Sequence, residues 1–275
     1  MEAIELWSGR DDDAVERCRR ALDDAKLAHA LLCLEQIPEH RRRVVQAKLD
    51  AWSGAVQRLK RLGGLSHHEA LRRVLVDAAS FIGECEDYYR PGNCLLSQVV
   101  QTRTGMPIML SSIWMVVAHR AAIRTEGIGL PGHFIIRIAG PPPLYVDPFG
   151  SGRTMTKERC MRMVRQLRNL DWDDRYLAAV DHRDILARVL TNLLMCYQRR
   201  GHGRAMYRMA RFSAMLFPAC VEHQWTHARV TEVLELDTLA VNLYENIVTH
   251  FPSSTYAKAA AAKLADLTVD RRPLH

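Results

Sequence analysis

The sequence predicts an α+β protein, in which N-terminal helices and a small antiparallel sheet are followed by all-α helical hairpins. Apolar residues recur at three- to four-residue intervals over residues 11–62 and again from Asp184 onward, which is the spacing of amphipathic helices. Between these two regions, short β-prone segments are bounded by Gly and Pro. We therefore expect two domains, residues 1–180 with the sheet and residues 181–275 with the hairpins.

The predicted sheet follows a helix that is apolar nearly all round, from Ile108 to about Ala122, which indicates a central, buried helix. Pro107 suits the first turn of this helix, because the N–H that proline lacks would have no partner there. The expected strands span about 127–130, 133–139 and 144–146, with a possible edge strand at 153–155. A basic helix at 156–167 should come next.

Local signals predict the ends of the N-terminal helices. Pro38 separates two helices, and Gly63–Gly64 ends the second. Ser66 and Glu69 form a capping box that opens a third helix, which should run to about Phe81. Asn93 is expected to cap a short helix from Cys94 to Arg103.

The C-terminal region contains a weak internal repeat. The Phe217–Pro218 and Phe251–Pro252 pairs lie 34 residues apart, which is the period of tetratricopeptide repeats. Two helical hairpins, with residues 256–267 as a capping helix, fit this pattern. Stacked hairpins of this period commonly form a concave binding surface. We therefore expect a protein or peptide partner for this region.

Composition limits the classes of function. No apolar run approaches the roughly 18 residues of a membrane span, and the N-terminus lacks a basic signal region. The seven cysteines are scattered and never form a C-x-x-C pair, which favours reduced thiols in a cytoplasmic protein. The net charge of +7 comes from basic clusters interleaved with acids, so we do not expect nucleic-acid binding. We also expect no cofactor and no metal, because no phosphate-binding glycine loop or dinucleotide fingerprint is present and the His223/His227 pair lacks a third ligand.

The segment from Gly105 to Asp147 carries the most chemistry. A helix is followed by a strand that should begin at His133 and a strand that should end near Asp147. This layout is the supporting half of a cysteine-nucleophile triad, in which a base and its orienting carboxylate face a helix N-terminus. The helix begins instead with Pro107 and Ile108, and neither side chain can attack a carbonyl.

Other side chains could replace the missing nucleophile. Cys94 begins the preceding helix and would lie in the cleft if that helix packs alongside. Ser111 and Ser112 lie one turn inside the central helix, where hydroxyls more often bond a backbone carbonyl. Thr104 is the weakest candidate.

Four motifs together resemble the SirB-type family, bacterial proteins that join a transglutaminase-like core to C-terminal tetratricopeptide repeats. They are residues 88–93 (YYRPGN), 103–111 (RTGMPIMLS), 131–134 (PGHF) and 146–149 (VDPF). Cys94 departs from the Ser that usually follows the Asn of this family. The resemblance implies a papain-like α+β core, with His133 as the base and Asp147 as its orienter. Its cleft would be lined by Asn93, Gly105, Pro107, Ile108, Gly132 and Phe149.

Three hypotheses follow. The first is a pseudoenzyme scaffold, which presents a cleft and binds a partner through its helical hairpins. The second is a cryptic cysteine or serine hydrolase or amide-transferase that uses His133 and Asp147 with Cys94 or Ser111. The third is a basic regulator that touches nucleic acid through its N-terminal helices. We favour the first, because the expected nucleophile is absent.

Overall fold

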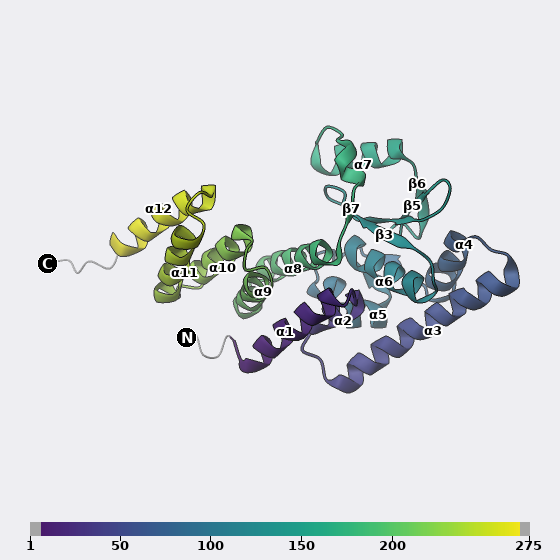
Figure 1. The fold of residues 1–275 in the computed structure, drawn as a ribbon, viewed down its shortest axis with the longest axis horizontal. Coiled ribbons are helices and arrows are strands. Elements are labelled where there is room, and N and C mark those ends of the chain that lie inside the picture. The colour runs from purple at the N-terminus through teal and green to yellow at the C-terminus, as the bar shows by residue number, and fades with distance from the viewer. Residues whose placement is uncertain (1–6, 270–275) are drawn as a thin grey trace. The chain divides into compact units, whose positions relative to one another are not determined.

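The computed structural model describes residues 7–269, and its contacts divide the chain into two compact units (Figure 1). The larger unit comprises residues 17–189, and the smaller comprises residues 7–16 and 190–269. The division falls within helices α1 (Gly9–Asp23) and α8 (His182–Arg199), slightly beyond the boundary near residue 180 that the sequence suggested. None of the helices within residues 7–269 is both long enough and apolar enough to cross a membrane.

The larger unit contains a small antiparallel sheet, as predicted, in the order β6-β5-β4-β3-β7. Its strands are β3 (Thr125–Ile128), β4 (Ile135–Ile138), β5 (Leu144–Asp147), β6 (Arg153–Met155) and β7 (Ala179–Val180). The edge strand β6 lies where the sequence suggested, whereas β7 had no clear local signal. His133 does not begin a strand but lies in the turn that precedes β4.

Helix α6 (Pro107–Arg120) is the buried centre of this unit, with Pro107 in its first turn as predicted. Every residue from Pro107 to Ala118 is buried. The helix packs against β3 and β4 and against helices α2 and α3 (Figure 1). An almost uniformly apolar sequence therefore forms this helix because protein surrounds it on all sides.

The remaining helices of the larger unit cover this centre. They are α2 (Leu27–Cys33), α3 (Glu39–Gly63), α4 (His67–Arg72), α5 (Leu96–Thr102) and α7 (Lys157–Arg168). Ser66 caps α4 by accepting a hydrogen bond from the Glu69 N–H, and a π-helical turn continues α4 to Ala78. A separate parallel pair, β1 (Ile82–Gly83) and β2 (Thr104–Gly105), joins the segments on either side of α5.

One prediction for the N-terminal helices was wrong, because two helices rather than one precede Pro38. Helix α1 ends at Asp23, and Ala25 adopts a left-handed conformation with φ of 55°. The Lys26 N–H then bonds the Ala21 carbonyl at 2.7 Å, which closes a Schellman-type turn. Glycine usually occupies this position, so the turn had no sequence signal.

The predicted cap of α5 was also wrong. Asn93 lies in a 3₁₀ turn (Pro91–Cys94), and its amide donates to the carbonyls of Asp87 and Tyr88. The N-terminus of α5 is instead satisfied by Glu35, whose carboxylate accepts the Ser97 N–H at 2.9 Å. Glu35, which lies 62 positions from Ser97 in the sequence, therefore caps the N-terminus of α5.

The smaller unit contains helices α9 (Gly203–Leu216), α10 (Val221–Val233), α11 (Asp237–His250) and α12 (Thr255–Val269), and each packs against the next. The 34-residue spacing recurs in the backbone. Gly201 and Glu235 are both left-handed, at φ of 66° and 58°, and Phe217 and Phe251 cap α9 and α11 with closely similar dihedral angles. The sequence repeat is therefore also a structural repeat of two helix ends.

Candidate functional site

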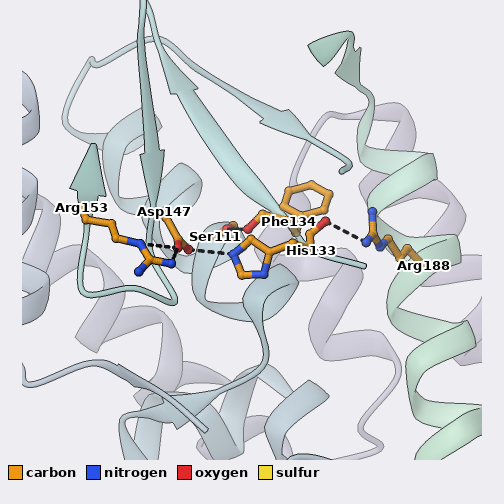
Figure 2. Close-up of polar contacts among 6 residues, drawn as sticks. All are labelled: Ser111, His133, Phe134, Asp147, Arg153 and Arg188. Carbon is orange, nitrogen blue, oxygen red and sulfur yellow. Dashed lines mark hydrogen bonds and ion pairs between the residues drawn. The ribbon is translucent and has the colours of Figure 1, made fainter. Parts of the chain in front are cut away.

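The turn before β4 and the end of β5 bring His133 and Asp147 together (Figure 2). The His133 Nε2 atom lies 2.9 Å from Asp147 Oδ1, and because an ionised carboxylate only accepts, the imidazole donates. Both side chains are buried, with exposed fractions of 7% and 0%. The pairing of β4 with β5 fixes this approach, since Ile136 lies opposite Val146 in the ladder.

The second oxygen of Asp147 is held by Arg153. Arg153 lies opposite Asp147 in the β5–β6 ladder, and its guanidinium donates to Asp147 Oδ2 at 2.7 and 3.0 Å. Gly150 permits this approach, because an added Cβ there would lie 2.5 Å from Arg153 Nε and 2.7 Å from Asp147 Oδ2. Asp147 is therefore fixed on two sides, by an imidazole and by a guanidinium.

This environment stabilises the charged form of Asp147. Burial by itself would raise the pKa of Asp147. The hydrogen bond from His133, the electrostatic attraction of His133 and Arg153 and the Gly150 N–H together outweigh burial, and the pKa of Asp147 is lowered from its ordinary value. The carboxylate is consequently an anion at neutral pH and serves as a fixed acceptor.

The other ring nitrogen of His133, Nδ1, has no hydrogen-bond partner within residues 7–269. The ring instead meets Phe149 edge to face, with centroids 5.7 Å apart. Phe149 in turn contacts Tyr88 and lies against Gly83, where an added Cβ would come within 2.6 Å of the ring. A nitrogen of this kind could act as a base if an acidic proton were placed beside it.

The backbone that carries His133 is anchored by Arg188 and Ser111 (Figure 2). Arg188 donates to the His133 carbonyl at 2.8 Å and to the Leu130 carbonyl at 2.9 Å, and its guanidinium lies over the Phe134 ring. The Ser111 hydroxyl donates to the Phe134 carbonyl at 3.2 Å. These bonds hold the His133–Phe134 segment between α6 and α8.

The candidate nucleophiles all have other partners. Cys94 is 1% exposed, and its sulfur lies 3.0 Å from the Met106 sulfur. Ser111 bonds the Phe134 carbonyl, Ser112 donates to the Ile108 carbonyl at 2.8 Å, and Thr104 bonds Thr102. His133 forms no hydrogen bond with any of them in the described part of the chain.

The six predicted cleft residues occupy different environments. Phe149 contacts the His133 ring, and Gly132 precedes His133 with a left-handed φ of 80°. Asn93, Gly105, Pro107 and Ile108 are buried. Asn93 and Gly105 belong to the packing around α5, where the Asn93 carbonyl accepts the Met106 N–H and an added Cβ at Gly105 would meet Val99 at 2.9 Å.

Sequence reasoning missed Arg153 and Arg188. Arg153 had a usable signal, because a hairpin between the strand ending at Asp147 and the suggested edge strand brings these two residues opposite each other. Arg188 had none, because its partners are backbone carbonyls more than 50 residues away.

No group of three or more His, Cys, Asp and Glu side chains within residues 7–269 could hold a metal ion. His223 bonds the Ser213 hydroxyl at 2.7 Å, whereas His227 is buried against the Tyr207 ring. The two histidines of α10 therefore have separate surroundings.

Comparisons with known proteins agree with this architecture. Residues 43–191 match the family model of the transglutaminase-like superfamily. A UPF0162 protein of Xylella fastidiosa (strain Temecula1) is 31% identical over 212 residues, which cover 75% of each chain. A UPF0162 protein of Vibrio cholerae is 22% identical over 206 residues, which cover 74% of this chain and 76% of that protein.

A similarity over a shorter stretch extends to a human protein. F-box only protein 21 of Homo sapiens is 28% identical over 165 residues, which cover 57% of this chain but only 26% of that protein. No solved structure matches the chain. The family model spans more than half of the chain and the Xylella relative is 31% identical over three quarters of each chain, so the chain belongs to the transglutaminase-like superfamily.

Proposed function

We propose that this protein is a pseudoenzyme, a transglutaminase-like protein that performs no covalent catalysis and acts as an interaction or regulatory scaffold. The observation that carries the proposal is that, within residues 7–269, no thiol or hydroxyl is hydrogen-bonded to His133. The central helix begins with Pro107 and Ile108, and the candidate thiol and hydroxyls have other partners. A base without a nucleophile cannot form an acyl-enzyme.

The retained pair has a structural use that supports this proposal. Asp147 links the turn before β4, through His133, to strand β6, through Arg153. It therefore joins three consecutive segments of the sheet by charge-assisted hydrogen bonds. The His133–Asp147 pair would therefore stabilise the fold even in a protein that catalyses no reaction.

We further propose that the C-terminal hairpins are degenerate tetratricopeptide repeats that bind a protein or peptide. The recurring backbone turns at Gly201 and Glu235 support the repeat. A cavity of about 330 Å³ lies among α9, α10 and α11, and Leu243, Asn246 and Phe251 contribute to its lining. A short apolar or mixed side-chain segment of a partner would fit such a cavity.

The test of the pseudoenzyme proposal compares the purified wild type with His133→Gln, Cys94→Ala and Ser111→Ala on activated ester and amide substrates. We expect all four proteins to give the same background rate. Turnover that disappears in His133→Gln and in one nucleophile variant would instead establish the cryptic hydrolase.

The test of the scaffold proposal uses two matched variants of α11. Asn246 and Asn242 are exposed and one turn apart, but only Asn246 lines the cavity. Asn246→Arg should weaken the binding of a co-purifying partner, whereas Asn242→Arg and His133→Gln should retain it. Equal binding by both asparagine variants would exclude this cavity as the docking site.

A further inference from the structure

A second chemically distinctive place in the larger unit is formed by Cys18 and Cys33. Cys18 lies on α1, and Cys33 is the last residue of α2 (Figure 1). Both side chains are buried, with exposed fractions of 0% and 3%. The Cys18 sulfur lies 3.6 Å from the carbonyl of Ala30, three residues before Cys33 on α2. Cys18 therefore contacts the helical turn that ends at Cys33, and each thiol affects the ionisation of the other.

Cys33 opens onto a cavity of about 650 Å³ bounded by α1, α2 and α3. The charged side chains that line it are Arg17, Arg20, Asp24, Lys26, Glu39, Arg42, Arg43 and Asp50, together with His29. Several of the acids are already neutralised by neighbours: Lys26 pairs with Asp24, Arg43 with Glu39 and Arg120 with Asp50. The cavity wall around Cys33 is therefore net positive.

Arg42 is the cation that reaches the sulfur. Its Nε atom donates to the Ile37 carbonyl at 3.2 Å, which fixes the guanidinium, and its side chain also hydrogen-bonds Cys33. In the described part of the chain neither Arg42 nor Arg17 forms an ion pair within 4.0 Å of a carboxylate, although the charge of Arg42 also acts on Glu35. Both positive charges favour an anion on Cys33.

These contacts change the acidity of the thiol. The hydrogen bond from Cys18 lowers the pKa of Cys33, burial opposes it, and Arg42 and Arg17 lower it further, to about 6. Cys160 provides a contrast within the same unit. Burial and the negative charges of Asp147 and Glu158 raise the pKa of Cys160 to about 11. Of these two buried thiols, Cys33 is the one set up to be a thiolate.

We infer that Cys33 is a site of oxidation by hydroperoxides, with Cys18 as the resolving thiol that converts it to a reversible disulfide. The cavity admits a molecule as small as hydrogen peroxide, and the adjacent thiol supplies the second sulfur. This combination of an anionic sulfur and a resolving neighbour characterises redox-sensitive cysteines. The inference does not depend on the proposed scaffold role.

The chemistry balances in two steps. The Cys33 thiolate attacks one peroxide oxygen, the O–O bond breaks, and Cys33 becomes a sulfenic acid while hydroxide leaves and takes up a proton. The Cys18 sulfur then attacks the Cys33 sulfur, the S–O bond breaks, and water leaves with the Cys18 proton. Two electrons pass from the two sulfurs to the peroxide. A dithiol reductant restores both thiols by exchange.

The experiment uses the full chain carrying Cys85→Ser and Cys220→Ser, which removes the exposed and the half-buried thiol. Protein at pH 7 is treated with micromolar hydrogen peroxide in the presence of dimedone, and peptides are identified by mass spectrometry. We expect a Cys18–Cys33 disulfide in this background and a dimedone adduct on Cys33 once Cys18→Ser is added. Oxidation of Cys33 no faster than that of Cys160 would overturn the inference.

A matched pair of arginine variants tests the mechanism. Arg42→Gln should slow Cys33 oxidation about tenfold, because a smaller fraction of the thiol is ionised. Arg43→Gln removes a charge from the same cavity but from a side chain paired with Glu39, and should leave the rate within about twofold of the parent. Thermal unfolding of each variant confirms that it is folded. Equal rates in folded Arg42→Gln and Arg43→Gln would show that Arg42 does not activate the thiol.

Discussion

His133 donates a hydrogen bond to one oxygen of Asp147, and Arg153 donates to the other. One buried carboxylate is therefore bound by two proton-donating side chains. His133 is nearly buried, whereas the Arg153 side chain is 44% exposed. The carboxylate therefore depends more on the imidazole than on the guanidinium for a partner shielded from water. This relationship leads to the first prediction.

Asp147→Asn should lower the free energy of unfolding by about 3 kcal/mol, because it removes the anion that satisfies a buried imidazole and a guanidinium. Urea denaturation measures the loss. Arg153→Gln is the control and should cost less than about 1 kcal/mol, since water can reach that side chain. Similar losses in the two variants would contradict the unequal roles assigned here.

Because of the same carboxylate, we expect the free energy of unfolding to decrease at acidic pH. The pKa of Asp147 is lower in the folded protein than its ordinary value of 3.8, so the unfolded chain takes up the proton first as the pH falls. Its contribution is complete above the unfolded pKa and is lost as the pH falls through the folded pKa. Urea titrations below pH 5 should show a shallower loss of stability in Asp147→Asn than in the wild type.

Because of His227, we expect a second dependence of the unfolding free energy on pH, in a higher pH range. Burial lowers its pKa from 6.5 to about 4, and the charge of Arg211 adds to this. Between these values the unfolded chain binds the proton and the folded chain does not, so stability decreases as the pH falls, by about 3 kcal/mol in total. Its Nε2 atom is also buried and has no hydrogen-bond partner among residues 7–269.

His227→Phe should therefore flatten the dependence of unfolding free energy on pH between 6.5 and 4. The ring contact with Tyr207 would be kept by the new side chain. Thr249→Val, a change that involves no ionisable group at an exposed position of α11, should leave the slope unchanged. An unaltered slope in His227→Phe would rule out this residue as its source.

Gly83 should be intolerant of a side chain because of Phe149. An added Cβ would lie 2.6 Å from the Phe149 ring, which would have to move away from His133. Gly83→Ala should cost about 2 kcal/mol in the wild type and clearly less in a Phe149→Ala background. Urea denaturation of the double-mutant cycle measures the coupling. Equal costs in both backgrounds would show that the contact does not constrain Gly83.

Glu35 should stabilise α5 through long-range capping. Glu35→Ala leaves the Ser97 N–H without its buried acceptor and should cost about 2 kcal/mol, with faster amide exchange in the first turn of α5. Glu39→Ala is the matched control, because that carboxylate is exposed and forms its ion pair with the exposed Arg43. It should change stability by less than about 0.5 kcal/mol. Unchanged exchange at α5 in Glu35→Ala would contradict the capping role.

Local chemistry predicted those elements whose ends depend on neighbouring residues. Pro107 marked the first turn of α6, Ser66 and Glu69 marked the start of α4, and the spacing of the Phe–Pro pairs marked two equivalent helix ends. Predictions from the sequence were wrong where a helix end depends on a distant residue or on an unusual residue type. Ala25 ends α1 without a glycine, and Glu35 rather than Asn93 satisfies the N-terminus of α5.

The amino-acid sequence by itself determined the order of the helical and strand-forming regions, the uniformly buried α6 and the presence of an imidazole and a carboxylate in neighbouring segments of the sheet. The tertiary structure decided how those side chains are used. It brought the Arg153 guanidinium to Asp147, the Arg188 guanidinium to the His133 carbonyl and the Cys18 thiol to the last turn of α2. The physical reason is that turns and caps depend on adjacent residues, whereas a buried charge or thiol takes its character from whatever distant segments pack around it.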